Sequence, residues 1–310
     1  MAITAGMVKE LREMTGAGMM DCKKALNETN GDMEAAVEFL RKNGQAKAEK
    51  KAGRIAAEGL VRVAMEGNSA AIVEVNSETD FVAKNETFQA YVEAVAAQAL
   101  KSEATTVEAL LEEAWIEDAT KTVKEAHVEK VATIGENLTI RRFQKETVEG
   151  GCLVSYIHGG GRIGVIVKAE TAVVNDAVKE ALTNIAMQVA ALNPLYTSRA
   201  EISEEYIAHE EEILLAQIKN DPKEAAKPEK VIQGMIKGRI NKQLKEICLL
   251  DQVYVKAEDG KQTVEQYVAE VSKANDTKIN VLGFVRFETG EGIEKKEENF
   301  AEEVAKQMGM

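Results

Sequence analysis

Residues 59–75 read GLVRVAMEGNSAAIVEV, and this stretch decides the fold. Apolar residues alternate with others on both sides of a Glu-Gly-Asn turn, which is the pattern of two antiparallel strands joined by a tight turn. A helical pattern follows, with apolar residues at Phe88, Val92 and Val95 and with Asn85 placed to cap the first turn. The stretch therefore predicts a strand–turn–strand–helix unit.

The same plan returns later in the chain. The displacement from Leu60 to Leu153 is 93 residues, and it carries Val92 onto Ile185 without a gap. Related copies of such a unit generally pack side by side. The sequence therefore predicts an α+β fold with two repeated core subdomains. The first is expected at 55–145, and the second at 146–195 together with 251–287.

Helical segments are expected around this core. Residues 1–44 show three short helical patterns separated by glycine turns, the last ending at Asn43-Gly44, and they predict a small three-helix bundle. Residues 45–54 are strongly basic and are expected to form a solvated linker. Residues 107–131 carry another helical pattern. Residues 196–250 are predicted to be an inserted helical hairpin, and residues 288–310 a C-terminal module that ends in a helix.

Composition limits the kind of partner. The chain has 310 residues and a formal net charge of −13, which argues against an extended nucleic-acid surface and against an anionic membrane. Its three cysteines lie far apart and fit no zinc-binding spacing, which is typical of reduced thiols in the cytoplasm. No stretch has the pattern of a signal peptide or a membrane span. We expect a cytoplasmic protein.

The sequence lacks a pattern for catalysis. GGGRIG at 159–164 satisfies the GxGxxG spacing, but a strand follows it where the dinucleotide fingerprint needs a helix N-terminus to meet phosphate. A hairpin turn is the better interpretation. No P-loop motif occurs, and His127, His158 and His209 have no nucleophile or metal ligand close to them in sequence. A binding protein is predicted, not an enzyme, with neither cofactor nor metal.

One aromatic residue stands in an unusual place. Residues 74–84, EVNSETDFVAK, run from the second strand through a polar turn that ends in Phe81. A helix begun at Asp80 would place Phe81 and Phe88 on one core face. Phe81 is thus either a core residue or a contact for a partner, and the sequence leaves both interpretations open. Both corresponding positions of the second copy, 173–174, are valine, so this polar–aromatic tip belongs to the first copy.

Three stretches resemble the bacterial elongation factor Ts family. They are LREMTGAGMMDCKKAL at 11–26, EVNSETDFVAK at 74–84, and GFVRF at 283–287 followed by GEGIE at 290–294. The resemblance covers the whole chain in order and implies a guanine-nucleotide exchange factor for elongation factor Tu, the GTPase that delivers aminoacyl-tRNA to the ribosome. It also implies that the N-terminal bundle resembles a ubiquitin-associated domain and contacts the partner's nucleotide-binding domain.

The resemblance also assigns site residues. The family's Thr-Asp-Phe-Val motif disturbs the partner's magnesium site, and here it falls on Thr79, Asp80, Phe81 and Val82. The phenylalanine is expected to wedge into the partner near the magnesium, and the aspartate to make polar contacts there. Further partner contacts are implied for Arg12, Met19, Met20, His158, Gly159 and Phe300. The inserted hairpin is the family's dimerisation element in some bacteria, so the resemblance leaves room for a homodimer.

Other interpretations compete with this one. A scaffold or chaperone-like protein would recruit partners through the bundle without affecting nucleotide, and an enzyme would use the turn at 159–164 to hold a phosphate. Met19 and Met20 fit the core of the bundle better than an interface, although methionine suits adaptable surfaces. Phe300 and Val304 form too narrow an apolar stripe for a deeply buried helix, which favours docking of the last helix on a partner.

Overall fold

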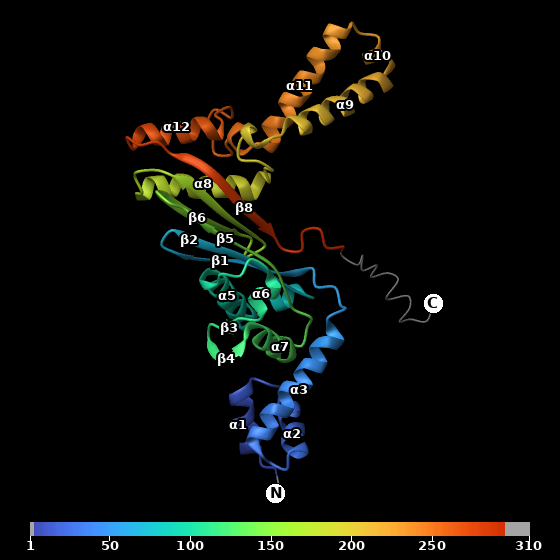
Figure 1. Cartoon of the computed structure of the whole chain (residues 1–310), viewed down its shortest axis with the longest axis vertical. Coiled ribbons are helices and arrows are strands. Elements are labelled where there is room, and N and C mark those ends of the chain that lie inside the picture. Colours follow the sequence, from blue (N-terminus) through green and yellow to red (C-terminus); the bar gives the residue numbers. More distant parts are fainter. Residues whose placement is uncertain (1–2, 295–310) are drawn as a thin grey trace.

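The computed structural model describes residues 3–294 and combines helices with antiparallel sheets, which confirms the α+β class (Figure 1). A small helical bundle lies at one end of an elongated molecule and a helical hairpin protrudes at the other, with the sheets between them (Figure 1). Across the described range, no helix has both the length and the apolar character needed to cross a membrane.

Two three-stranded antiparallel sheets form the core. The first has the order β1-β2-β5, from β1 (Glu58–Glu66), β2 (Ser69–Ser77) and β5 (Thr139–Thr147). The second has the order β6-β7-β8, from β6 (Gly151–His158), β7 (Ile163–Glu170) and β8 (Asn280–Glu288). The displacement of 93 residues carries β1 onto β6 and β2 onto β7. The sequence repeat thus corresponds to two sheets of the same order.

The two sheets pack face to face, and helices cover their outer faces. The residues between the sheets include Val61, Ile72, Leu153, Ile166, Val285 and Phe287. The outer face of the first sheet packs against α5 (Glu86–Lys101), which in turn contacts α7 (Val123–Ile134), and that of the second packs against α8 (Asp176–Leu192), which in turn contacts α12 (Val264–Ala274). Because side chains alternate across a strand, β2 and β7 contribute to two cores each and are apolar along most of their length.

Residues 107–131 do not form one helix, which corrects the expectation from sequence. They contain α6 (Val107–Leu111), the short hairpin β3 (Ala114–Trp115) and β4 (Asp118–Thr122), and then most of α7. Two helix caps explain the division. Thr106 caps α6, and Thr122 forms a capping box with Glu125 at the start of α7, so the helical pattern belongs to two helices.

The N-terminal bundle consists of α1 (Ala5–Thr15), α2 (Met19–Glu28) and α3 (Met33–Lys51). Leu11, Cys22, Leu26 and Ala36 form its small core. The expected helix end at Asn43-Gly44 is wrong, because α3 continues to Lys51 through most of the segment expected to be a linker. Gly44 faces α7, and a Cβ built on it would lie 3.5 Å from Cβ of Ala132. This tertiary contact outweighs the low helix propensity of glycine.

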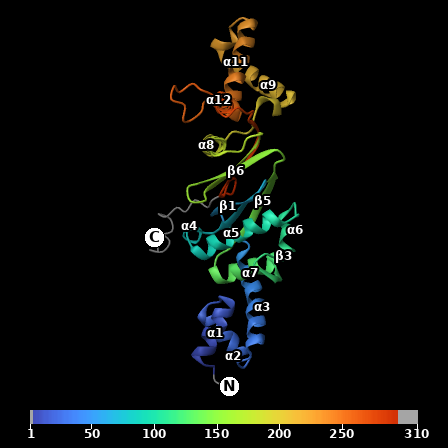
Figure 2. The ribbon, with the colours of Figure 1, turned by 90° about the vertical axis from the view of Figure 1, so that its left-hand side faces the viewer.

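The inserted segment forms a helical hairpin, seen at the top of Figure 1 and again in Figure 2. Its arms are α9 (Glu204–Asn220) and α11 (Glu229–Ile247), joined through the single turn α10 (Pro222–Ala225). Ile218, Ile236, Ile240 and Leu244 are buried between the arms. At the base, backbone hydrogen bonds from Tyr196 to Ile247 and from Leu249 to Tyr196 close the insertion, so the hairpin leaves the core and returns at one point.

Candidate functional site

The Thr-Asp-Phe-Val segment forms a single helical turn, α4 (Asp80–Ala83), between β2 and α5. Thr79 is its N-cap, and the hydroxyl accepts a hydrogen bond from the amide of Val82 at 3.4 Å. Asn85 then caps α5 by accepting from the amide of Thr87 at 2.8 Å. The chain therefore starts a new helix after α4 and does not continue the old one.

This break decides where Phe81 points. Phe88 is fully buried under the first sheet, whereas the side chain of Phe81 is 79% exposed. The interpretation in which Phe81 and Phe88 share one core face is therefore wrong, because the two residues lie on different helices. Val82, in contrast, packs against the first core and anchors the turn.

A charged pair lies beside the exposed ring. Lys84 Nζ lies 2.6 Å from a carboxylate oxygen of Asp80 and 5.9 Å from the centre of the Phe81 ring. The hydrogen bond from Lys84 holds the pKa of Asp80 below its usual value. The tip thus presents an aromatic ring next to an ionised carboxylate, a combination that can enter an apolar crevice with a polar rim.

Glu136 holds the base of this tip. Its Oε2 accepts hydrogen bonds from the amides of Glu78 and Thr79 at 3.0 and 3.1 Å, and its Oε1 accepts from the Thr79 hydroxyl at 2.6 Å. Glu136 follows Gly135, the left-handed C-cap of α7 with φ of +90°, so the end of α7 determines where the carboxylate lies.

A second set of contacts completes this support. The Glu78 carboxylate accepts from the amide of Asn137 at 2.6 Å and from Arg54 at 3.4 Å. The Asn137 side chain donates to the carbonyl of Arg54 at 2.7 Å. Three chain segments therefore meet at the base of the tip: the connection that follows α3, the residues just after β2, and the residues just before β5. Burial lowers the pKa of Lys51 at the end of α3, and nearby Arg54 lowers it further.

His158 ends β6 and Gly159 begins the turn between β6 and β7, and both are exposed. The Tyr156 hydroxyl and His158 Nδ1 are 2.9 Å apart. This turn packs on the start of β1, where the amide of Val61 donates to the carbonyl of Gly161 at 2.7 Å. Glu58, at the start of β1, pairs with Ser77 at the end of β2, from which the Phe81 tip leaves. The structure thus brings the turn and the tip to the same end of the two sheets.

The chain after β8 reaches this end as well (Figure 1). The Thr289 amide donates to the carbonyl of Arg162 at 2.9 Å, in the turn between β6 and β7. Gly290 lies directly on the segment before β1 with φ of +73°, and a Cβ there would come within 2.1 Å of the Ala57 carbonyl oxygen. A residue other than glycine would therefore force this exit segment away from β1.

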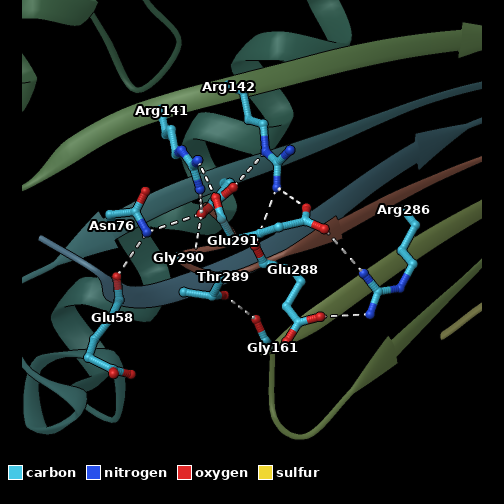
Figure 3. A network of polar contacts seen from close by, with 11 residues as sticks. Glu58, Asn76, Arg141, Arg142, Gly161, Arg286, Glu288, Thr289, Gly290 and Glu291 are labelled. Carbon is cyan, nitrogen blue, oxygen red and sulfur yellow. Dashed lines mark hydrogen bonds and ion pairs between the residues drawn. The ribbon is translucent and has the colours of Figure 1, made fainter. Parts of the chain in front are cut away.

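A buried carboxylate ties this exit segment to the first sheet. Glu74 is fully buried, and its Oε1 accepts from Arg141 at 3.0 Å and from the Gly290 amide at 2.8 Å. Its Oε2 accepts from Arg142 at 2.6 Å. Arg142 also donates to Glu291 at 3.2 Å, and Figure 3 shows both arginines pointing into this junction. Both of Glu74's oxygens are satisfied, as a buried charge requires.

The remaining candidate residues lie on the bundle or beyond the described range. Arg12 is exposed, and Met19 and Met20 are 60% and 74% exposed. The preference for a core role of the two methionines is therefore wrong. They lie in the first turn of α2, whereas the core face of this helix is formed by Cys22, Ala25 and Leu26. Phe300 and the last predicted helix lie outside residues 3–294, so the structure describes neither.

Sequence reasoning missed the residues that hold the site in place. Glu136 and Asn137 are 57 and 59 residues away in sequence from Thr79 and Glu78, which they bind, and the short pattern around them resembles an ordinary helix end. Arg141 and Arg142 likewise resemble surface charges of a strand. No local signal marks such residues, because their partners are distant in sequence.

Comparison with known proteins shows the family. The family model described as Elongation factor TS matches residues 78–291, which is more than half of the chain. The chain belongs to the elongation factor Ts family. It is 52% identical over 309 residues to the elongation factor Ts of Clostridium botulinum (strain Eklund 17B / Type B). It is 54% identical over 308 residues to that of Clostridioides difficile (strain 630).

In both comparisons the match covers 99% of this chain and 99% of the relative. The same name is carried by a 52% identical protein of Clostridium perfringens (strain SM101 / Type A). Elongation factor Ts proteins are exchange factors of translation elongation, and membership in this family confirms the resemblance carried by residues 11–26, 74–84 and 283–294.

Proposed function

We propose that this chain binds elongation factor Tu in its GDP-bound form and speeds the release of GDP by disturbing the magnesium site of that GTPase. The observation that carries the proposal is the exposure of Phe81 on a tip whose base is held by hydrogen bonds. The Phe81 ring is exposed to water in the free protein, so covering it with a partner's surface stabilises the complex.

The proposed mechanism is a thermodynamic coupling. An exchange factor has to bind the empty GTPase more tightly than the nucleotide-bound GTPase, and the effect is reciprocal. Mg²⁺ holds the nucleotide phosphates in a strict octahedral shell, so displacing an element of that shell weakens nucleotide binding. Burying one phenylalanine contributes about 1.5–3 kcal/mol, which corresponds to roughly one to two powers of ten in affinity.

Larger effects need further contacts, and the fold offers surfaces for them. The turn with His158 and Gly159 lies at the same end of the sheets as the tip, and Arg12, Met19 and Met20 are exposed on the bundle. We propose that these residues make additional contacts with elongation factor Tu, with Phe300 in the C-terminal module. The action is binding without covalent chemistry, so the chain is not an enzyme in this proposal and needs no cofactor.

The test is the release of fluorescent GDP from elongation factor Tu. We expect the wild-type chain to accelerate release well above the spontaneous rate. We expect Phe81→Ala to slow the accelerated release by about tenfold or more, since it removes the wedge. Its melting temperature should hardly change, because truncation of an exposed side chain leaves stability within about 0.5 kcal/mol. The matched control is Ile116→Ala, which truncates another exposed apolar side chain on the β3–β4 hairpin.

Other outcomes would favour the competing interpretations. Binding to elongation factor Tu without faster release would support a scaffold or chaperone-like protein. Binding of GDP by this chain alone would support an enzyme that uses the turn at 159–164.

We further propose that the chain works in the cytoplasm, where translation elongation takes place, and without nucleic-acid or membrane partners. A homodimer through the α9–α11 hairpin is part of the same proposal. Sedimentation would test it by comparing the molecular mass of the wild-type chain with that of Val231→Glu, a variant of an exposed valine on the hairpin. A charge placed in the proposed apolar contact should separate the two copies.

A further inference from the structure

We propose that Glu136 is a positioning residue for nucleotide exchange: it acts through Glu78 and Thr79 to hold Phe81 in the orientation that its partner requires. The inference rests on the proposed function and extends it to a residue outside the Thr-Asp-Phe-Val motif. Glu136 itself lies at the base of the tip, where it contacts Glu78 and Thr79.

The argument begins with how little else holds the ring. Phe81 is 79% exposed, and Lys84 is the neighbour whose charge lies over its ring, at 5.9 Å. The orientation of the ring therefore depends on the backbone of α4, which is one turn of four residues. An isolated turn of this length is unstable, because a helical nucleus fixes several dihedral angles for one hydrogen bond. Val82 stabilises the turn on one side by packing against the first core, and the N-terminal end of α4 needs a contact of its own.

Glu136 supplies a contact at this end, just before the helix. Its carboxylate fixes the two residues that lead into α4, because it accepts from the amides of Glu78 and Thr79 and from the hydroxyl of Thr79, the N-cap residue. The Thr79 hydroxyl in turn accepts from the amide of Val82, one of the first amides of the helix that lack a partner within it. Charge-assisted hydrogen bonds of this kind are about twice as strong as neutral ones. The Thr79 hydroxyl can then present its lone pair to the amide of Val82 while it donates to Glu136.

The second copy of the repeat shows that the fold itself does not need this carboxylate. There, residues 171–175 occupy the place of the tip and are irregular. Their contacts with the segment before β8 are neutral, from Thr171 to Thr277 at 3.2 Å and from Asn175 to Asn275 at 2.9 Å. The same junction is thus closed without a charge where no aromatic residue has to be presented. The carboxylate occurs in the copy that carries Phe81.

The experiment compares four variants for release of fluorescent GDP from elongation factor Tu: Glu136→Ala, Glu136→Gln, Phe81→Ala and the double variant Phe81→Ala/Glu136→Ala. We expect Glu136→Ala to lower the maximal rate of release by about tenfold, and to change the concentration for half-maximal rate by less than about threefold, because other surfaces dock the partner. Glu136→Gln should keep most of the wild-type rate. The side-chain carbonyl of glutamine can accept from the backbone amides of Glu78 and Thr79, and its side-chain amide NH2 can donate to the Thr79 hydroxyl.

The double variant gives the sharpest test. If Glu136 acts through Phe81, removing Glu136 from the Phe81→Ala protein should cost nothing further, whereas independent effects would multiply. Amide hydrogen exchange provides a readout in the free chain: it should become faster at residues 78–83 in Glu136→Ala and stay unchanged in β7. Glu112→Ala serves as the matched control, because Glu112 is an exposed glutamate of the same subdomain that pairs with Lys124.

Each result has a distinct meaning. Multiplying losses in the double variant, equal losses in Glu136→Gln and Glu136→Ala, or a normal rate in Glu136→Ala would each overturn the inference. If Phe81→Ala releases GDP as fast as wild type, the proposed role of Phe81 fails instead. A slow Phe81→Ala protein beside a normal Glu136→Ala protein leaves the proposed function standing and removes this inference alone.

Discussion

At the scale of single residues, His127 illustrates how the fold fixes a protonation state. Its Nε2 lies 3.0 Å from the carbonyl oxygen of Leu138, and its Nδ1 lies 2.7 Å from the Tyr91 hydroxyl. A carbonyl can only accept, so Nε2 carries the hydrogen and Nδ1 accepts from Tyr91. Burial lowers the pKa of His127 to about 4, and the folded protein therefore holds a neutral imidazole.

This residue should make stability fall in mild acid. The unfolded chain takes up a proton near pH 6.5 and the folded chain near pH 4, so the contribution of His127 is fully present above pH 6.5 and is lost as the pH falls towards 4. We expect a loss of about 1–3 kcal/mol in the free energy of unfolding between pH 7 and pH 4.5. Urea unfolding at several pH values measures it, by comparing wild type with His127→Gln.

The variant should show a flatter pH dependence than wild type. The exposed His209 gives the control, because His209→Gln should leave the wild-type profile in place. Equal slopes in wild type and His127→Gln would show that the imidazole is not held neutral.

The two most informative residues of the site differ in how they can be found. Phe81 could be singled out from sequence, because a large aromatic ring after a polar turn conflicts with the local pattern. Its exposure could not, since this depends on whether a new helix begins at Asn85. Glu136 could not be found at all, because its hydrogen bonds join segments 57 or more residues apart.

At the scale of elements, α3 shows why the boundary of a helix can be misjudged. Asn43 and Gly44 are typical of a helix end, and their local preference favours a stop. Helix α3 instead packs against α7 at Gly44, where a Cβ built on the glycine would lie at an ordinary contact distance of 3.5 Å from Ala132 Cβ. Contacts with another element overrode the propensity of two residues. A different cause divides residues 107–131, where the local caps Thr106 and Thr122 separate α6 from α7, and the Thr-x-x-Glu spacing at 122–125 is itself a sequence signal for the start of a helix.

The size of the side chain at position 44 should therefore determine whether the bundle stays docked. Gly44→Ala should raise the free energy of unfolding by up to about 1 kcal/mol, because a Cβ fits and alanine favours the helix. Gly44→Leu should lower it by about 1–3 kcal/mol, because the larger side chain collides with Val128 and Ala132. Thermal unfolding followed by circular dichroism measures both changes.

The control for this pair lies in α11. Gly238 is an exposed helical glycine with open space around its Cα, so leucine should be tolerated there. A Gly44→Leu protein as stable as Gly238→Leu would mean that α3 and α7 are not in close contact in solution.

At the scale of the whole molecule, the repeat was the part of the fold that the sequence predicted best. Apolar-rich segments on either side of short turns identified β1, β2, β6 and β7, because strands that contact a core on both faces are apolar along much of their length. The third strand of the first sheet was not anticipated, since β5 carries Arg141 and Arg142 where a core strand would carry apolar residues. The structure explains them, because both guanidinium groups contact the buried Glu74.

That buried carboxylate should be critical for the assembly of the two sheets. Glu74→Ala removes the buried carboxylate that Arg141 and Arg142 share and leaves the Gly290 amide without its acceptor, so we expect a loss of about 3–5 kcal/mol in the free energy of unfolding. Urea denaturation measures the loss. In the control Glu103→Ala, a 96% exposed side chain loses its contact with Lys145, and the change should stay below about 1 kcal/mol. Similar values for the two variants would contradict the role assigned to Glu74.

Because α3 is one continuous helix, its length fixes how the N-terminal bundle is rotated relative to the core. Each residue inserted into an α-helix turns everything before it by about 100° relative to everything after it. One extra residue between Gly44 and Lys51 would swing the bundle around the helix axis, and the exposed methionines of α2 would then face another direction from Phe81. Seven extra residues would nearly restore the direction while moving the bundle about 10 Å along the axis. The number of residues in this segment therefore determines the angle between the surface with the exposed methionines of α2 and the surface with Phe81. A flexible linker of the same length would not fix that angle.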